Sequence, residues 1–262
     1  MAFWYYNKHG QNHVDLSKED MGLDVYLCAS GPSLSDIDNY KLNESGAFIV
    51  GVNNSYPHIK PHLWVGMDDP RCYHYQIWTD PCMKVLRGGY ANREYYGKDI
   101  KASHNLFYAD CRWYKEHEKE NVFKQPKKGE RIVFIWTKNV IGITMHMLVH
   151  MGAKRIHLLG SDLNNSDKQY WDNIVRDDEM KARNQRTYNQ VVDFYKWFSE
   201  TGKKYGVELI SCTKGSPIND FLPYKHYQEA IWETKKRREF ARHKQLSGPR
   251  IEEKRRENAT TS

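Results

Sequence analysis

The sequence predicts an α/β protein with a three-layer sandwich architecture, in which helices cover both faces of a mostly parallel sheet. Short apolar runs of strand length alternate with segments of helical periodicity along most of the chain. Each of the early apolar runs stops at polar residues, as expected where strand ends open onto a binding site. The 262 residues are 39% hydrophobic and 13% aromatic, which is enough for one sizeable packed core.

The predicted elements follow from these runs in order. In the first half we expect strands over 24–29, 47–52 and 62–67, a short helix over 33–40, and further short strands over 100–103, 106–108 and 132–135. In the second half we expect a helix over 142–151, a strand over 155–160, a polar loop over 164–178, a helix over 180–204 and a last strand over 207–212.

Composition divides the chain into three parts. Residues 1–22 read as a loose aromatic leader, and 23–233 as one domain. Within that domain, residues 71–130 are rich in Tyr, Trp, His and Lys with weak periodicity, which predicts an inserted lid. Residues 234–262 read as a basic tail, helical at first and disordered after 247–249.

Targeting signals and disulfides are not expected. No run of about 18 apolar residues exists, so no transmembrane helix is predicted. The aromatic N-terminus lacks a basic segment followed by an apolar stretch, so it does not read as a secretory signal. The five cysteines include no CxxC pair, which favours reduced thiols in a cytoplasmic protein.

The positive charge is concentrated in the tail. Residues 234–262 hold ten Lys or Arg and four Glu, so they carry +6 of the chain's net charge of +7. Attraction to a nucleic acid would therefore depend on this tail, because the remaining residues are almost neutral. The alternative is a charged helix that only improves solubility.

The segment Ser30-Gly31-Pro32-Ser33 joins the first predicted strand to its helix. Proline suits the first helical position, and serine suits the free N–H groups there. A helix that begins at the carboxyl end of a strand is an anion site, so a phosphate is the expected ligand. The alternative is an ordinary turn that binds nothing.

Two pairs of polar residues also follow predicted strands. Asp68 or Asp69 could act as a general base, and Asp69 could hold Mg²⁺ on a diphosphate. Only one of the two should face the site, because neighbouring side chains of a strand point in opposite directions. Asp162, after Ser161, could contact a ribose or a metal. The alternative for each Asp is a carboxylate that caps a local turn.

Cationic and aromatic side chains complete the candidates. Arg183 and Arg186, with Lys181, lie near the start of the long helix and could neutralise a donor phosphate, or they are solvated helix charges. The twelve histidines show no spacing that suits zinc. Aromatic residues of the leader and the lid could stack an acceptor sugar or base, or fill a core or a homo-oligomer interface.

Three blocks resemble, in this order, the bacterial lipooligosaccharide sialyltransferases and their relatives, the motility accessory factor glycosyltransferases and the archaeal 6-hydroxymethyl-dihydropterin pyrophosphokinases. The blocks are 27–42, 139–162 and 205–217, and with 52–54 they cover about half of the chain. Ala29 and Ser30 stand where this family usually has its first glycine and a neighbour.

The resemblance implies a Rossmann-like, GT-A-like single domain with an inserted lid region and a nucleotide-activated donor at the strand ends. Carried over position by position, it implies that Ser30, Gly31, Pro32 and Ser33 contact the donor phosphate. It implies that Asn53 or Asn54 binds the nucleotide and that Ser161 and Asp162 face the ribose or base. It also implies that Gly142, Ile143 and Thr144 present backbone N–H groups at a second helix start. The sialyltransferases use a His ahead of the last long helix as general base, but residues 178–186 contain none.

These observations lead to one preferred function and two alternatives. The preferred function is transfer of a sugar from a nucleotide sugar to an acceptor hydroxyl of a glycan, a protein or a modified nucleic-acid base. The first alternative is a pyrophosphokinase that uses ATP and Mg²⁺ on a pterin-like alcohol. The second is a nucleotide- or nucleic-acid-binding module without turnover.

Overall fold

The computed structural model describes residues 3–7, 9–14, 24–95, 98–100, 103–113, 116–124, 130–137, 139–164, 170–171 and 177–246. Parts of the predicted leader, lid and polar loop, and the tail beyond residue 246, lie outside these residues.

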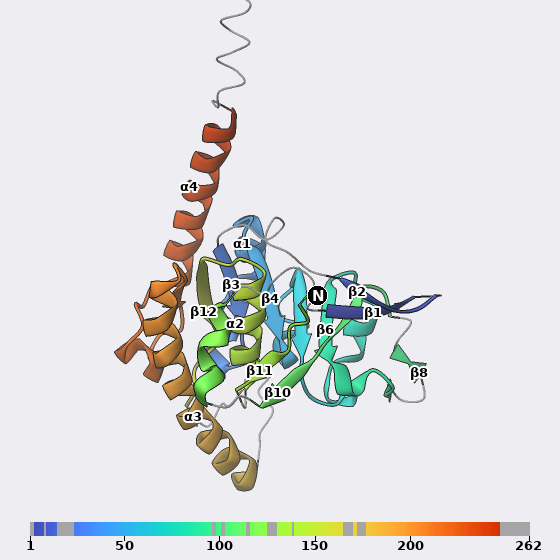
Figure 1. Cartoon of the computed structure of the whole chain (residues 1–262). Coiled ribbons are helices and arrows are strands. Elements are labelled where there is room, and N and C mark those ends of the chain that lie inside the picture. Colours follow the sequence, from blue (N-terminus) through green and yellow to red (C-terminus); the bar gives the residue numbers. More distant parts are fainter. Residues whose placement is uncertain are drawn as a thin grey trace, which may run out of the picture.

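One large sheet organises the described part of the chain (Figure 1). It contains nine strands in the order β13-β12-β3-β4-β5-β6-β9-β1-β2. The strands are β1 (Phe3–Asn7), β2 (Gly10–Val14), β3 (Asp24–Cys28), β4 (Phe48–Val52), β5 (Leu63–Gly66), β6 (Met83–Arg87), β9 (Leu106–Ala109), β12 (Arg155–Leu159) and β13 (Glu208–Ser211). All neighbours pair in parallel except at β1 and β2, so the predicted α/β class with a mostly parallel sheet is confirmed.

The central strands are buried on both faces, which explains why they read as continuous apolar runs. All five residues of β3 are buried, and so are all four residues of β5. In β3 the side chains of Val25 and Leu27 enter one core, whereas Tyr26 and Cys28 enter another. The sheet is therefore the middle layer of three.

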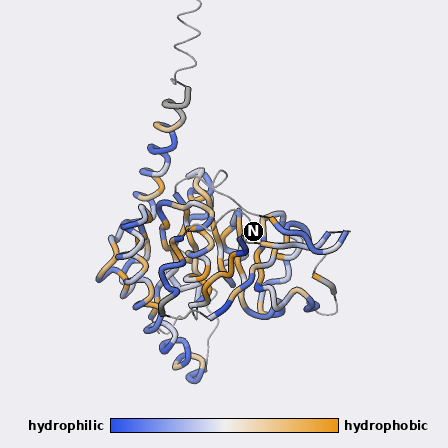
Figure 2. Tube along the Cα trace, in the orientation of Figure 1, coloured by the Kyte–Doolittle hydropathy of each residue, from blue (hydrophilic) through white to orange (hydrophobic). Residues whose placement is uncertain are grey.

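Two helices cover the first face. They are α2 (Val140–His150) and α3 (Asp178–Lys204). Asn139 begins α2 by accepting a hydrogen bond from the Ile141 amide, and Asp177 begins α3 by accepting one from the Met180 amide. Side chains such as Ile143 and Phe194 pack from these helices onto the first core, and Figure 2 shows hydrophobic residues gathered at the centre of the molecule.

Shorter elements and one long helix cover the second face. They are the 3₁₀ helix η1 (Pro32–Asp36), α1 (Asn39–Glu44) and α4 (Tyr227–Leu246). Leu34, Leu42 and Ile231 pack onto this face with Tyr26. The helix expected over 33–40 is therefore wrong in form: a five-residue 3₁₀ helix ends at Asp36, and a separate α-helix starts at Asn39.

The aromatic N-terminal segment is part of the sheet, which corrects the expectation of a loose leader. Strand β1 pairs with β9, with Phe3 opposite Ala109, and β2 pairs with β1 at the sheet edge. The Trp4 ring stacks on the Tyr108 ring with centroids 4.6 Å apart. This contact explains the aromatic composition of the segment, because burial of such rings stabilises an edge strand.

The region expected to be an inserted lid also contributes strands. Residues 71–130 contain β6 and β9 of the main sheet. They also contain the short strands β7 (Glu94–Tyr95) and β8 (Lys98–Asp99), which pair with each other. Strand β10 (Cys111–Trp113) pairs with β11 (Phe134–Trp136). Short 3₁₀ turns connect them: η3 (Pro70–Cys72), η4 (Tyr75–Trp78), η5 (Gly88–Tyr90) and η7 (Glu116–Phe123), while η2 (Asn53–Ser55) and η8 (Pro217–Asp220) follow β4 and β13.

Buried Lys84 stabilises this region. Lys84 is fully buried, and its ammonium group donates hydrogen bonds to the carbonyl oxygens of Asp80, Cys82 and His104 at 2.6–2.8 Å. Three carbonyls match the three donors of the group, so the charge is satisfied without a carboxylate. Burial nevertheless lowers the pKa of Lys84.

No helix in the described part of the chain is long and apolar enough to cross a membrane. Helix α4 runs through residue 234, where the sequence predicted that a separate tail begins. Thr234 is fully buried, and its hydroxyl lies 3.0 Å from the Tyr26 hydroxyl. The first half of α4 is therefore packed on the sheet, and only its later part projects from the body (Figure 1).

Candidate functional site

A cleft of about 460 Å³ lies at the carboxyl edge of the parallel strands, a volume typical of small-molecule sites. The ends of β3, β4, β5 and β12 form its floor, and the starts of α2 and α3 form its wall. The predicted residues that line it are Ser30, Gly31, Asn53, Asp68, Ser161, Asp162 and Arg183. Chain segments 132 residues apart thus meet where ligands bind in open α/β sheets.

The turn after β3 is held by a carboxylate. Asp162 accepts hydrogen bonds from the Ser33 amide (3.2 Å) and the Ser33 hydroxyl (2.9 Å). The amide that the sequence assigned to a phosphate is therefore already bonded, and Pro32 and Ser33 do not line the cleft. The structure therefore gives Pro32 and Ser33 a role in fixing the turn and not in contacting the phosphate. The five-residue η1 is also too short to present an anion site of its own.

Gly31 is required by a close approach of chain segments. A Cβ there would lie 2.2 Å from Oδ2 of Asp162 and 2.5 Å from the carbonyl oxygen of Gly160. The Gly31 amide itself donates to that Gly160 carbonyl at 2.9 Å. The turns after β3 and β12 therefore touch directly, and no larger residue fits between them.

Asp162 combines this structural role with exposure to the cleft. Burial raises its pKa, while the Ser33 hydrogen bonds act in the opposite direction. Its neighbour Ser161 is buried, with an amide that donates to the Thr213 hydroxyl and a carbonyl that accepts from the Ser216 hydroxyl. These backbone contacts place both residues at the cleft floor.

Asn53 and Asn54, after β4, are separated by the structure. Asn53 has a left-handed backbone, with φ of 47°, and lines the cleft. Its side-chain oxygen accepts a hydrogen bond from the Tyr73 hydroxyl at 3.3 Å, and its carbonyl accepts one from the Trp64 indole at 2.8 Å. Asn54 does not line the cleft; its carbonyl accepts a hydrogen bond from the Trp171 indole, so only Asn53 remains a candidate for nucleotide contact.

Asp68 is the acidic residue that lies in the cleft opposite a cation. It is solvent accessible, but the surrounding cleft walls raise its pKa, and the positive charge of Arg183 counters that shift. Its amide and the Tyr73 hydroxyl are 2.7 Å apart. A carboxylate with a raised pKa in a cleft is suited to accept a proton from a hydroxyl group.

Asp69 has a different role from the predicted one. Its side chain accepts hydrogen bonds from the Arg71 amide and guanidinium at 2.9–3.0 Å, which caps η3 and lowers its pKa to about 2. It does not line the cleft. Among the described residues, no group of three His, Cys, Asp or Glu side chains could hold a metal ion. The structure thus shows Asp69 held by Arg71 at the start of η3, outside the cleft.

The start of α2 contributes different residues from those expected. Asn139, Val140 and Ile141 line the cleft, whereas Gly142, Ile143 and Thr144 do not. Those three are buried in the helix. A Cβ on Gly142 would lie 1.9 Å from the Thr137 hydroxyl oxygen, so this glycine serves packing. The prediction was one helical turn too late.

Helix α3 provides one of the two predicted arginines. Arg183 lines the cleft, whereas Arg186 is exposed and does not. Lining residues that sequence reasoning did not assign to the site include Cys72, Leu163, Asn164, Tyr170, Met180, Asn184, Thr187 and Tyr188. Tyr188 was visible only as part of the apolar stripe of α3, and Tyr170 only as part of a polar loop.

The two tyrosines form a connected group. The Tyr170 hydroxyl accepts a hydrogen bond from the Asn184 amide at 3.2 Å. Burial and the hydrogen-bonded Tyr170 hydroxyl raise the pKa of Tyr188, which keeps it a neutral donor. Next to Tyr170, the Trp171 amide donates to the Ser30 carbonyl at 3.1 Å, and its ring lies 5.1 Å from the His58 ring. Residues 170–171 thus bridge α3 and the strand ends.

Comparisons with known proteins give only distant structural matches. No protein-family model matches the chain, and no curated protein matches its sequence. The sialyltransferase CstII from Campylobacter jejuni, in complex with the substrate analogue cytidine-5'-monophosphate, is 15% identical with a TM-score of 0.47, and the match covers 80% of this chain and 88% of that one. CstII in complex with CMP-3FNeuAc is also 15% identical, with a TM-score of 0.44 and coverage of 79% and 88%.

Proposed function

We propose that this chain is a glycosyltransferase that binds a nucleotide sugar in the cleft and transfers the sugar to an acceptor hydroxyl. The observation that carries the proposal is the pairing of Asp68 and Arg183 in one cleft. Transfer needs a base for the acceptor and a cation for the phosphate that leaves. The cleft supplies Asp68 after β5 as the base and Arg183 on α3 as the cation, whereas the carboxylate of Asp162 is held by Ser33.

The step is a displacement at the anomeric carbon. The acceptor oxygen forms a bond to that carbon, and the bond from the carbon to the phosphate oxygen of the donor breaks. Asp68 takes the proton of the acceptor hydroxyl. Arg183 stabilises the charge that develops on the departing phosphate, because its planar guanidinium matches phosphate oxygens.

The remaining cleft residues suit a nucleotide. Gly31 lets the turns after β3 and β12 meet at the cleft floor, and Asn53 and Asp162 present polar groups at the ends of β4 and β12. Tyr170 and Tyr188 offer hydroxyl groups and ring faces. A mostly pre-formed cleft with a few convergent polar groups is the usual form of such a site.

The test is a thermal-shift panel with CMP, UDP, GDP and ATP, each with and without Mg²⁺, followed by hydrolysis assays with the sugar nucleotide of any base that stabilises the protein. We expect stabilisation by one nucleoside phosphate and slow hydrolysis of its sugar derivative. Asp68→Asn should abolish turnover while it keeps binding, and Arg183→Gln should weaken binding.

Adjacent residues provide matched controls. Asp69→Asn and Arg186→Gln change the same residue types just outside the cleft, so both variants should behave as the unmodified protein. Stabilisation by ATP only with Mg²⁺ would instead favour a pyrophosphokinase. Binding without any turnover would favour a module that does no chemistry, and equal effects of Asp68→Asn and Asp69→Asn would remove the assigned base.

A further inference from the structure

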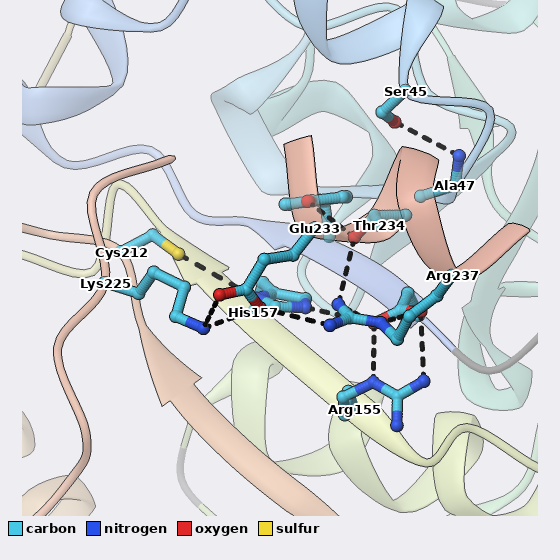
Figure 3. Close-up of polar contacts among 11 residues, drawn as sticks. Ser45, Ala47, Arg155, His157, Cys212, Lys225, Glu233, Thr234 and Arg237 are labelled. Atoms are coloured by element: carbon cyan, nitrogen blue, oxygen red, sulfur yellow. Dashed lines mark hydrogen bonds and ion pairs between the residues drawn. The ribbon is translucent and has the colours of Figure 1, made fainter. Parts of the chain in front are cut away.

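Helix α4 is fixed to the body by a buried ion-pair cluster (Figure 3). The carboxylate of Asp24 accepts hydrogen bonds from Arg155 at 2.7 Å and from Arg237 at 2.9 Å, and it lies 3.3 Å from Nε2 of His157. Arg237 also pairs with Glu233 at 3.1 Å. Because Asp24 begins β3 and Arg237 lies on α4, the cluster locks the helix onto the sheet.

Helix α4 has an exposed side along its packed half, and beyond Arg237 it projects from the body (Figure 1). Trp232, Lys236 and Phe240 are spaced by four residues, so they lie along one side of the helix. Trp232 is 56% exposed and Phe240 is 73% exposed. Two large aromatic side chains therefore stand in water on a helix whose other side, with Ile231 and Thr234, is buried in the body.

The same part of the helix carries cations. Lys236 lies over the Trp232 ring, with its ammonium 3.6 Å from the ring centroid, and Arg238 is exposed nearby. Among the described residues, neither of these two cations forms an ion pair with a carboxylate. Lys235 forms a long ion pair with Glu44, with 3.9 Å between the ammonium nitrogen and the carboxylate oxygen. Trp232, Lys235, Lys236 and Phe240, together with Arg238 on the side of the helix that faces Gly46, make this part of α4 positive and aromatic. It is here called the α4 arm.

The form of the α4 arm favours one class of anion. Insertion into a bilayer surface requires a continuous apolar face, and here the apolar side is already packed on the body while cations separate the exposed aromatic residues. Single-stranded nucleic acids need isolated aromatic platforms for unpaired bases and cations for the phosphates between them. Trp232 and Phe240 are eight residues apart, about 12 Å along the axis, or three to four nucleotides of a stacked strand.

We propose that the α4 arm binds single-stranded nucleic acid, with bases stacked on Trp232 and Phe240 and phosphates contacted by Lys235, Lys236 and Arg238. The arm leaves the body beside Asp24 and Gly46, at the amino ends of β3 and β4, whereas the cleft lies at their carboxyl ends. A strand on the arm therefore holds the protein on the nucleic acid and does not enter the cleft. This role is independent of the transferase proposal.

The experiment measures fluorescence anisotropy of a labelled 15-nucleotide poly-dT with the full chain, over a series of salt concentrations. We expect binding that weakens as salt rises. The double variant Lys236→Glu/Arg238→Glu should bind at least about tenfold more weakly and reduce the log–log salt slope by about 1.4, which is two phosphate contacts on a single strand. Trp232→Ala with Phe240→Ala should weaken binding about tenfold with little change in slope.

The matched control is Lys196→Glu/Lys214→Glu, which makes the same charge change at exposed positions away from the arm and should alter affinity less than twofold. Unfolding curves confirm that each variant folds. The proposal is overturned if poly-dT does not bind, or if the control variant loses affinity to the same extent. It is also overturned if a duplex of equal length binds more tightly, or if only vesicles of anionic phospholipid bind. Nucleotide-sugar turnover in the cleft should be the same in the unmodified chain and in the three double variants.

Discussion

Asp162 and Ser33, 129 residues apart, are joined by three hydrogen bonds in which one carboxylate accepts from both the amide and the hydroxyl of the serine. This contact connects the turn after β12 to the turn after β3. It is the connection that gives the floor of the cleft its shape, because Gly31 lies directly against the same carboxylate.

The first prediction concerns that pair. Ser33→Ala and Asp162→Ala should each lower the free energy of unfolding by about 1–2 kcal/mol, because each leaves a partly buried polar group without its partner. The double variant should cost less than the sum, since the two residues interact directly. Urea unfolding followed by circular dichroism measures all three, and strictly additive values would contradict the coupling.

The second prediction concerns Asp68 and follows from the proposed transferase activity. The surrounding cleft walls partly desolvate the accessible carboxyl of Asp68 and raise its pKa above the usual value of 3.8. Only the ionised carboxylate accepts a proton, so kcat/KM should fall as the pH drops through this raised pKa. Asp68→Asn should lower kcat by about 100-fold or more and remove that limb of the profile.

The raised pKa also fixes the sign of the effect of Asp68→Asn on stability. A carboxyl group whose pKa is higher in the folded state opposes folding once the pH has risen through that pKa. At neutral pH the substitution should therefore raise the melting temperature slightly while it abolishes turnover. A lower melting temperature would show that Asp68 is needed for the fold, and the loss of activity would then say nothing about a base.

The third prediction concerns the buried cluster at Asp24. Burial by itself raises the pKa of Asp24, but hydrogen bonds from His157, Arg155 and Arg237 outweigh it and hold the pKa far below 3.8. Stability from this group is therefore complete above the unfolded pKa and is lost as the pH falls below about 4. Asp24→Asn should cost about 3–5 kcal/mol at pH 7, because it removes the carboxylate that neutralises Arg155 and leaves Arg237 with Glu233.

Unfolding free energies at pH 7 and pH 3 provide the check. The difference between the unmodified protein and Asp24→Asn should shrink at the lower pH, because the carboxylate begins to protonate in the unfolded chain. Asp38→Asn is a suitable control, since Asp38 pairs with Lys41 on the exposed surface and should contribute little at either pH. A difference that is the same at both pH values contradicts the assignment.

The fourth prediction concerns the buried Lys84. Lys84→Met keeps the volume of the aliphatic chain but removes the donor to three carbonyl oxygens. It should lower the free energy of unfolding by about 3 kcal/mol, because buried acceptors lose their partner. Lys196→Met, at an exposed position, should change stability by less than about 0.5 kcal/mol in the same thermal denaturation experiment.

The fifth prediction concerns Trp171. Trp171→Phe keeps a ring beside His58 but removes the indole donor to the Asn54 carbonyl. Because the adjacent Tyr170 lines the cleft, nucleotide affinity measured by calorimetry should fall severalfold while the melting temperature changes little. Trp232→Phe, on the α4 arm, is the control and should leave nucleotide affinity unchanged. Equal affinity in Trp171→Phe would mean that the bridge does not position the cleft wall.

Much of the fold could be predicted because burial of the sheet leaves a simple pattern in the sequence. The runs at 47–52, 62–67, 155–160 and 207–212 match β4, β5, β12 and β13, and the stripe at 180–204 matches α3. Strand β2 could not be found, because its polar sequence becomes a strand only through pairing with β1. The form of η1 depends on Asp162, which is far away along the chain.

The site could be placed at the strand ends but not resolved into residues. Asp68 and Asp69 are equivalent in the sequence, and only the bond from Arg71 to Asp69 separates their roles. Arg183 and Arg186 lie one helical turn apart, and Arg183 shares the cleft-facing side of α3 with Met180 and Thr187, whereas Arg186 does not. Tyr170 had no periodic signal, since its position depends on contacts with α3.

The pairing of β1 with β9 has a consequence for biosynthesis. The ribosome delivers Phe3 first, but its partner Ala109 emerges more than a hundred residues later, after several seconds at about 5–20 residues per second. Throughout that interval the N-terminal aromatic side chains have no sheet to join. Chaperones that recognise exposed aromatic segments would therefore find a binding site in residues 3–6 of the nascent polypeptide during this interval.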